Sequence, residues 1–176
     1  DQPKLFARLV AALDSKKVNI FDAQIMTNKD GYAMDTFVIL EQNGEAVNSP
    51  SRQQSIKRAL ELFIAGKPDL SRQKTKLSRQ MRQFNVPPKV VFLPGNTSKR
   101  TMIELAALDT PGLLANIGEV FQRCDVNIHA AKITTIGERA EDFFMISNSD
   151  DQALSSEQQS TLKRALIEQL SQQTEG

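Results

Sequence analysis

An internal repeat constrains this chain more than any other feature of its sequence. Residues 1–27 match residues 109–135 without a gap, and the match continues after one extra residue in the turn near Gly31. A unit that recurs in a sequence predicts modules that share one topology. We therefore interpret the chain as a tandem pair of modules. The aligned identities pair Asp1 with Asp109, Pro3 with Pro111, Leu5 with Leu113, Ala7 with Ala115, Asn19 with Asn127, Ile20 with Ile128, Asp35 with Asp142 and Phe37 with Phe144.

The second copy reads as loop, helix, strand, turn and strand. Apolar residues recur at helical spacing over residues 113–124, and residues 126–135 and 140–147 have the composition of strands joined by a short turn. In the loop before the helix, we expect Asp109 or Thr110 to cap the helix with its side chain. This order of elements indicates an α+β module.

The alternation of apolar residues slips by one position inside the strand that follows the first helix. Val18 and Ile20 lie on one face of an ideal strand, whereas Ala23 lies on the other, and the second copy repeats the slip. Such a slip would turn the core face outward unless an extra residue is absorbed. We therefore predict a β-bulge or bend near residues 21–22 and near residues 129–130, which would direct neighbouring side chains toward a site.

A helix and then a basic segment lie between the two copies. The helix is expected over about residues 51–64, and Gly66 ends it. Residues 67–89 are rich in Lys and Arg, with Asp69 as their one acid, and their apolar residues are spaced for a short amphipathic helix. The segment is either a solvated connector or a basic docking surface for the rest of a parent enzyme or an acidic partner. A nucleic-acid contact is a weaker interpretation, because aromatic residues are not interleaved with the charges.

Two short strands are predicted ahead of the second copy, at residues 90–93 and 101–108. We expect them to pair as a hairpin, because the second module ends in a helix at about residues 156–172 and needs an edge strand from elsewhere. The alternative is that residues 90–93 close the sheet of the first module. Asp1 occupies the loop position of its module, so the first strand of that module is expected upstream. Upstream residues or another chain would then fill its place beside the third strand.

The motifs of the second copy resemble those of the ACT domain. They are the opening D-x-P-G-L-L, the triplet V-N-I after the helix and the A-K-I-x-T that follows. The resemblance implies a ferredoxin-like βαββαβ fold that binds small effectors, most often amino acids, beside an enzyme. We thus expect two antiparallel ACT modules, the first lacking its first strand. Their boundaries are predicted as 1–66 for the first module, 67–89 for the connector and 90–176 for the second module with its leading edge strand.

Longer motifs in the second module resemble one particular group of ACT-containing enzymes. T-x-I-E-L-x-A-x-D-x-P-G-L-L-A-x-I-G, followed by A-K-I-T-T-I-G-E-R-A-E-D-F-F, is similar to the C-terminal region of the bacterial enzymes that attach UMP to the PII nitrogen-signalling protein and remove it. The resemblance implies a regulatory pair that senses L-glutamine and acts on upstream catalytic domains of the same chain. It also implies PII as a partner and magnesium in the catalytic part of the parent enzyme. The alternatives are a sensor of another amino acid and a purely structural module that forms homodimers through its sheets.

Composition excludes several classes of function. The net charge is +1, so bulk charge selects neither nucleic acid nor membrane as a partner. The single cysteine allows no internal disulfide, which fits a reducing compartment, and no apolar run approaches the ~20 residues that a membrane-spanning helix needs. With one histidine, the chain cannot hold a metal site built from several His and Asp residues. We expect a cytoplasmic region without catalytic residues, metal or cofactor of its own.

The loop before each first helix is the candidate ligand site. Backbone N–H groups at a helix start have no partner within the helix and favour a carboxylate, and Gly112 allows a close approach to the backbone. When two ACT sheets lie side by side, as the resemblance implies, a glutamine would bridge loop 109–114 and Asn19, or loop 1–6 and Asn127. The first loop has Lys4 in place of glycine, so its site is expected to be altered. The candidate residues are Asp109, Thr110, Gly112, Leu113, Leu114, Asn127, Ile128, Asp1, Leu5, Phe6, Asn19 and Ile20.

Overall fold

The computed structural model describes residues 5–27, 30, 32–67, 86–94, 99–110, 112–136 and 138–175. Asp1, Lys4 and Pro111, together with most of the predicted 67–89 connector and its helix, lie outside these residues. The helices and strands are α1 (Leu5–Ser15), β1 (Val18–Thr27), β2 (Ala33–Glu41), α2 (Pro50–Ile64), β3 (Lys89–Phe92), β4 (Thr101–Leu108), α3 (Leu113–Arg123), β5 (Asn127–Ile136), β6 (Arg139–Ser147) and α4 (Ser156–Glu175).

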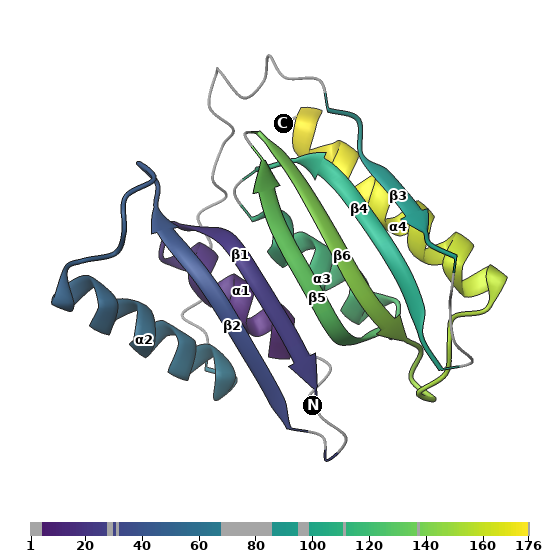
Figure 1. Cartoon of the computed structure of the whole chain (residues 1–176), viewed down its shortest axis with the longest axis horizontal. Helices are drawn as coiled ribbons and strands as arrows, with labels where there is room; N and C mark the ends of the chain where they lie inside the picture. Colours follow the sequence, from purple (N-terminus) through teal and green to yellow (C-terminus); the bar gives the residue numbers. More distant parts are fainter. Residues whose placement is uncertain are drawn as a thin grey trace.

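The described strands form one six-stranded antiparallel sheet in the order β2-β1-β5-β6-β4-β3. The first module contributes α1, β1, β2 and α2, and the second contributes β3, β4, α3, β5, β6 and α4 (Figure 1). The order helix, strand, strand, helix occurs in both modules, as the repeat predicts. The predicted α+β, ACT-type fold is confirmed. The domain boundaries stay a prediction.

The two modules meet along β1 and β5, so their sheets pair within one chain. The register places Asp22 opposite Thr134 and Met26 opposite Ala130. Lys132 of β5 also forms an ion pair with Asp22 of β1 across this junction. Because the strands are antiparallel, the start of β1 lies near the end of β5, where the second module turns into β6.

The main hydrophobic core runs beneath both modules, and a smaller cluster around Leu13, Val18 and Ile56 belongs to the first module. In Figure 1, α1, α3 and α4 lie behind the sheet, and α1 contacts both α2 and α3. Phe144 of β6 is fully buried and meets Phe6 of α1 and Phe121 of α3 edge-on, with ring centroids 6.1 Å and 5.1 Å apart. Edge-to-face pairs of this kind stabilise beyond the area that they bury. Since Phe6 belongs to the first module, the two modules share this core.

Both predicted bulges are present. The β1–β2 register shifts between Ile20 and Asp22, and the β5–β6 register shifts between Ile128 and Ala130. The turns that lead into β1 and β5 also match, because Lys17 and Asp125 adopt φ values of 53° and 54° at corresponding positions of the repeat. The apolar faces of both strands therefore reach the core in spite of the slip in the sequence.

The hairpin predicted ahead of the second copy is confirmed. Strand β3 pairs with β4, from Lys89 opposite Ala106 to Phe92 opposite Ile103. At the other end of the sheet, β2 pairs with β1 on one side. On its other side, within the described part of the chain, it carries only an isolated bridge between Leu40 and Ala46. The place beside the third strand of the first module is thus a sheet edge, and what pairs there stays a prediction.

The predicted cap of the second module's first helix is wrong. Gly112 is the N-cap residue, with φ 79°, and no side chain caps the helix. The Leu113 N–H donates to the Thr110 carbonyl over 3.0 Å, and the first i→i−4 bond of the helix runs from the Asn116 N–H to the Gly112 carbonyl, also over 3.0 Å. A glycine reaches this left-handed conformation without steric cost, which makes an Asp109 or Thr110 cap unnecessary.

Candidate ligand site between the two modules

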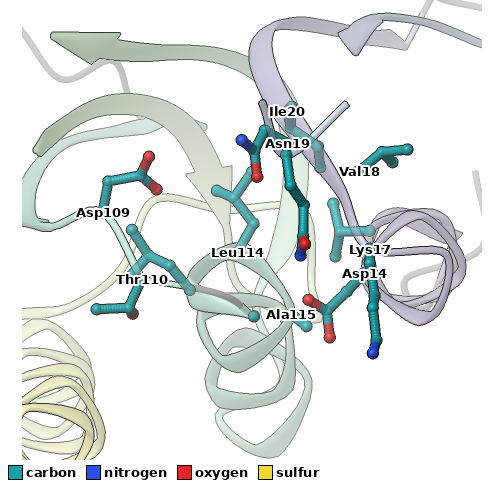
Figure 2. Close-up of a pocket in the computed structure, with 13 residues that line it drawn as sticks. Asp14, Lys17, Val18, Asn19, Ile20, Asp109, Thr110, Leu114 and Ala115 are labelled. Carbon is teal, nitrogen blue, oxygen red and sulfur yellow. The ribbon is translucent and has the colours of Figure 1, made fainter. Parts of the chain in front are cut away.

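A cavity of about 400 Å³ lies where the start of β1 meets the loop between β4 and α3. Its volume falls in the ~300–1,000 Å³ range of small-molecule sites. Its walls come from both modules (Figure 2). We call it the intermodule cavity. It is lined by Val10, Asp14, Lys17, Val18, Asn19, Ile20, Gln42, Asp109, Thr110, Gly112, Leu113, Leu114 and Ala115.

Seven of the residues predicted from sequence line this cavity together. Those from the second module belong to the loop and to the first turn of α3, and those from the first module belong to the start of β1. The loop residues and Asn19, which the resemblance predicted to meet, therefore line one cavity, and ligand binding there stays a prediction. The seven are Asp109, Thr110, Gly112, Leu113, Leu114, Asn19 and Ile20.

The remaining predicted residues lie elsewhere. Asn127 is at the start of β5, where its Nδ2 donates a hydrogen bond to the Asn148 carbonyl over 3.2 Å. Ile128 and Phe6 are buried in the core, at 7% and 5% exposure. Leu5 begins α1 and is half-buried. Asp1 lies outside the described residues, so the structure does not test the second predicted site at loop 1–6.

Sequence reasoning missed six residues of the cavity: Val10, Asp14, Lys17, Val18, Gln42 and Ala115. Two of them are placed by the turn that joins α1 to β1, where the Lys17 N–H donates to the Asp14 carbonyl over 2.8 Å. The repeat indicates this turn, because its counterpart precedes the second Val-Asn-Ile triplet. It does not indicate which segment of the partner module the turn faces, and that information comes only from the β1–β5 pairing.

Asp14 of the first module lies beside Gly112 of the second. A Cβ added to Gly112 would lie 3.5 Å from Asp14 Oδ2. Figure 2 shows the Asp14 carboxylate directed from α1 toward Ala115, at the first turn of α3, with Asp109 on the far side of Leu114. The glycine therefore admits a side chain of the first module to the positive end of a helix in the second.

Two acids of the second module, Asp109 in the loop before α3 and Asp142 in β6, have raised pKa values. Burial raises the pKa of Asp109, and a hydrogen bond from Thr135 opposes the rise. Asp142 is 1% exposed, and burial raises its pKa to about 7, with a further rise from the charge of Asp109. The Thr134 N–H donates to Asp142 Oδ1 over 3.4 Å and opposes the rise. Both carboxyl groups therefore resist ionisation, and Asp109 is the one of the two that lines the intermodule cavity. Asp14, which also lines it, is exposed.

A second cluster of polar side chains joins His129, Ser147 and Asp151 but has no catalytic arrangement. His129 Nε2 lies 2.8 Å from Ser147 Oγ and 3.6 Å from Asp151 Oδ1. A Ser-His-Asp relay needs the serine and the acid on different ring nitrogens. The Ser147 hydroxyl also donates to the Asn148 carbonyl over 3.0 Å. The contacts of His129 therefore connect the bulge of β5 to the end of β6 and the loop after it.

In the parts of the chain that the structure describes, no group of three or more His, Cys, Asp or Glu residues is placed to hold a metal ion. No described helix has the length and apolar character needed to cross a membrane.

The fold resembles that of a solved aspartate kinase from Synechocystis, with a TM-score of 0.52 and 17% identity. The similarity covers 96% of this chain and 25% of the kinase. At this identity it supports the fold alone. No family model matches the sequence.

Other proteins have a much higher sequence identity to this chain than the kinase has. The chain is 48% identical over 172 residues to a protein of Vibrio campbellii, 49% identical over 171 residues to one of Pseudoalteromonas translucida and 44% identical over 172 residues to one of Vibrio cholerae. Each is named bifunctional uridylyltransferase/uridylyl-removing enzyme, and the matches cover 97–98% of this chain and 20% of each relative. The chain therefore spans about a fifth of the length of these relatives, and nearly all of it is similar to one region of bifunctional uridylyltransferase/uridylyl-removing enzymes.

Proposed function

We propose that this chain is the regulatory region of a bifunctional uridylyltransferase/uridylyl-removing enzyme and that it binds L-glutamine in the intermodule cavity. The observation that carries the proposal is the cavity itself, because loop 109–114 of one module and the start of β1 of the other form it together. The rest of the enzyme would supply catalysis, with magnesium, and would act on PII in the cytoplasm. The fragment would contribute no catalytic residue.

The chemistry of the walls fits the three polar groups of glutamine. The first N–H groups of α3 have no acceptor within the helix, so a carboxylate is favoured there, with Lys17 as the cation on the opposite wall. The amides of Asn19 and Gln42 both donate and accept hydrogen bonds, which suits a side-chain amide. Leu113 and Leu114 leave an apolar surface for the methylene groups between these polar ends.

A ligand bound in this cavity would contact both modules. A ligand that touches the loop before α3 and the start of β1 favours one arrangement of the two modules over others. Coupling to the catalytic domains requires a different affinity in two arrangements of the enzyme, typically worth about 1–3 kcal/mol. A cavity within a single module would not provide this link.

Isothermal titration of L-glutamine into the chain tests the proposal. We expect saturable heat at millimolar ligand or below, and a smaller response to L-glutamate, L-asparagine and L-serine. Asn19→Ala should weaken binding about 2- to 10-fold, which corresponds to the loss of one hydrogen bond of roughly 0.5–1.5 kcal/mol. Asn127→Ala is the matched variant of the other module. A loss of affinity or stoichiometry in that variant would reveal a second site at loop 1–6.

Two alternatives make different predictions in the same titration. A sensor of another amino acid would respond more strongly to a member of the panel than to L-glutamine. A purely structural module would give no heat with any of them, although β1 and β5 would still join the modules. An enzymatic role for the fragment would require UTP-dependent labelling of PII by the chain alone, which we expect to be absent.

A further inference from the structure

Four methionines lie in one row that crosses the sheet. The strand pairings place Met34 of β2 opposite Met26 of β1, and Met26 opposite Ala130 of β5. Ala130 in turn lies opposite Met145 of β6, and Met145 lies opposite Met102 of β4. These are four of the chain's five methionines. Since neighbouring strands lie about 4.8 Å apart, the row is about 19 Å long. We call these five residues the methionine row.

The methionine row lies on the face of the sheet that points away from the main core. Side chains alternate between the two faces of a strand, and the next residues along three of the strands, Ile25, Phe144 and Ile103, are buried in that core. Figure 1 shows α1, α3 and α4 behind the sheet, on the side of the core. Met26 is 49% exposed and Met34 is 64% exposed. Much of these two apolar side chains is therefore in contact with solvent.

A second row, mostly polar, borders the methionine row on the same face. Two residues along each strand, the pairings align Thr36, Gln24, Lys132, Phe143 and Glu104. We call these residues the polar row. An apolar centre beside a polar rim is the usual layout of a protein–protein interface. Contiguous apolar patches on the surface of soluble proteins mark interaction sites. This face therefore has the composition of an interface.

The methionine row is placed to contact both modules without blocking the ligand site. It contains residues of β1 and β2 from the first module and of β4, β5 and β6 from the second. Strand β1 runs from the intermodule cavity, at Asn19, to the methionine row, at Met26. Methionine side chains are flexible and polarisable, so they pack against surfaces of varied shape. Such a surface suits a partner whose position changes when the cavity is filled.

We propose that the methionine row is the surface on which the rest of the enzyme docks, through an apolar strip of its own. The chain matches 20% of the length of each of three relatives, so most of each relative lies outside the matched region. This inference rests on the proposed function, because a sensor of L-glutamine has to be coupled to the catalytic part through packed contacts. A second copy of this chain is the alternative occupant of the same face.

Methionine oxidation in the full-length enzyme tests this docking. Hydrogen peroxide converts methionine to its sulfoxide at a rate that follows exposure, and peptide mass spectrometry gives the rate at each residue. The variant Ile64→Met supplies the matched control, because Ile64 lies at the end of α2, outside the sheet. Ile64 is 46% exposed, which is close to the exposure of Met26. Without docking, the three positions would oxidise at similar rates.

We expect Met26 and Met34 to oxidise about fivefold or more slowly than the control methionine, at concentrations where sedimentation velocity shows a monomer. Equal rates at the three positions would overturn the inference. Slow oxidation that becomes fast when a dimer dissociates on dilution would also overturn it, because the occupant would then be a second copy.

A pair of substitutions on β2 tests whether this docking carries the signal. In the full-length enzyme, Met34→Glu places a charge in the methionine row, and Thr36→Glu places the same charge in the polar row of the same strand. We expect Met34→Glu to leave the affinity for L-glutamine within about twofold. It should reduce the effect of L-glutamine on uridylyltransferase activity about fivefold or more, whereas Thr36→Glu should retain that effect.

Two results separate this inference from the proposed function. An effect of L-glutamine that survives Met34→Glu unchanged would overturn the inference while leaving the proposed function intact. An unmodified enzyme that does not bind L-glutamine would refute the proposed function, and the oxidation rates at Met26 and Met34 would then decide the docking by themselves.

Discussion

Gly118 lies in the middle of α3 and faces α1 of the other module. A Cβ added to it would lie 3.0 Å from Ala7 Cβ, 3.1 Å from Ala7 Cα and 3.5 Å from Phe6 Cδ1. Contacts of 3.0–3.4 Å are tighter than nine in ten of those that real Cβ atoms make, and a backbone Cα atom cannot rotate away. The substitution Gly118→Ala therefore requires α1 to move away from α3, which loosens the packing between the modules.

Two effects of opposite sign decide the outcome of this substitution. Alanine is favoured over glycine in a helix interior by about 1 kcal/mol. Overpacking a core costs about 1–3 kcal/mol. Because the nearest atoms belong to the backbone and Cβ of α1, we expect the overpacking to dominate and the free energy of unfolding to fall by about 1 kcal/mol. For a chain of this size, the melting temperature should fall by ~2–4 °C.

A double-mutant cycle measures the contact directly. Ala7→Gly removes the methyl group that Gly118→Ala would meet, so the double variant moves one methyl group from α1 to α3. Urea denaturation followed by circular dichroism would give the four free energies of unfolding. We expect the double variant to be more stable than the sum of the single effects by at least about 1 kcal/mol. Additive effects, or stabilisation by Gly118→Ala alone, would refute the close packing of α1 on α3.

Two further predictions concern Asp142 of β6 and Gly112 at the start of α3. The fold raises the pKa of Asp142 from its ordinary value of 3.8 to about 7, so between these pH values the folded chain holds a proton that the unfolded chain releases. The stabilisation that comes from the protonated Asp142 therefore declines as the pH rises from 3.8 and is lost above about pH 7. Asp142→Asn should flatten this pH dependence in thermal melts and raise the melting temperature at pH 8; an unchanged slope from pH 5 to pH 8 would contradict the reasoning. Gly112 has φ 79°, so Gly112→Ala should cost about 1–2 kcal/mol in thermal melts, and Gly112→Asn should cost less, because asparagine tolerates that conformation. Equal melting temperatures for these two variants would count against backbone strain as the cause.

The parts of the fold that the sequence predicted are those with a periodic or repeated signal. The slip in apolar alternation between Ile20 and Ala23 predicted a bulge, and the register of β1 on β2 shifts at that point. The hairpin of β3 and β4 followed from the lack of an apolar strand after the last helix. The cap of α3 was mispredicted, because a left-handed glycine and a capping side chain are alternative ways to begin a helix and the motif contains residues suited to both.

The candidate site was predictable in outline only. The resemblance to ACT domains that lie side by side predicted that loop 109–114 and Asn19 would be close together. No local pattern in the sequence shows which strands pair between modules. Asp14 and Gln42 were missed for the same reason, because each lies in a turn or strand end whose sequence describes only its own module. The β1–β5 pairing, which joins residues far apart in the chain, supplies this information.

Amide hydrogen exchange with and without L-glutamine tests the central claim most directly, because it reports on both walls of the intermodule cavity in one measurement. We predict that L-glutamine slows exchange together at residues 17–20 and at residues 112–116, with the same ligand dependence. Protection confined to one of these segments, or no change in either at saturating ligand, would contradict a site shared by the two modules.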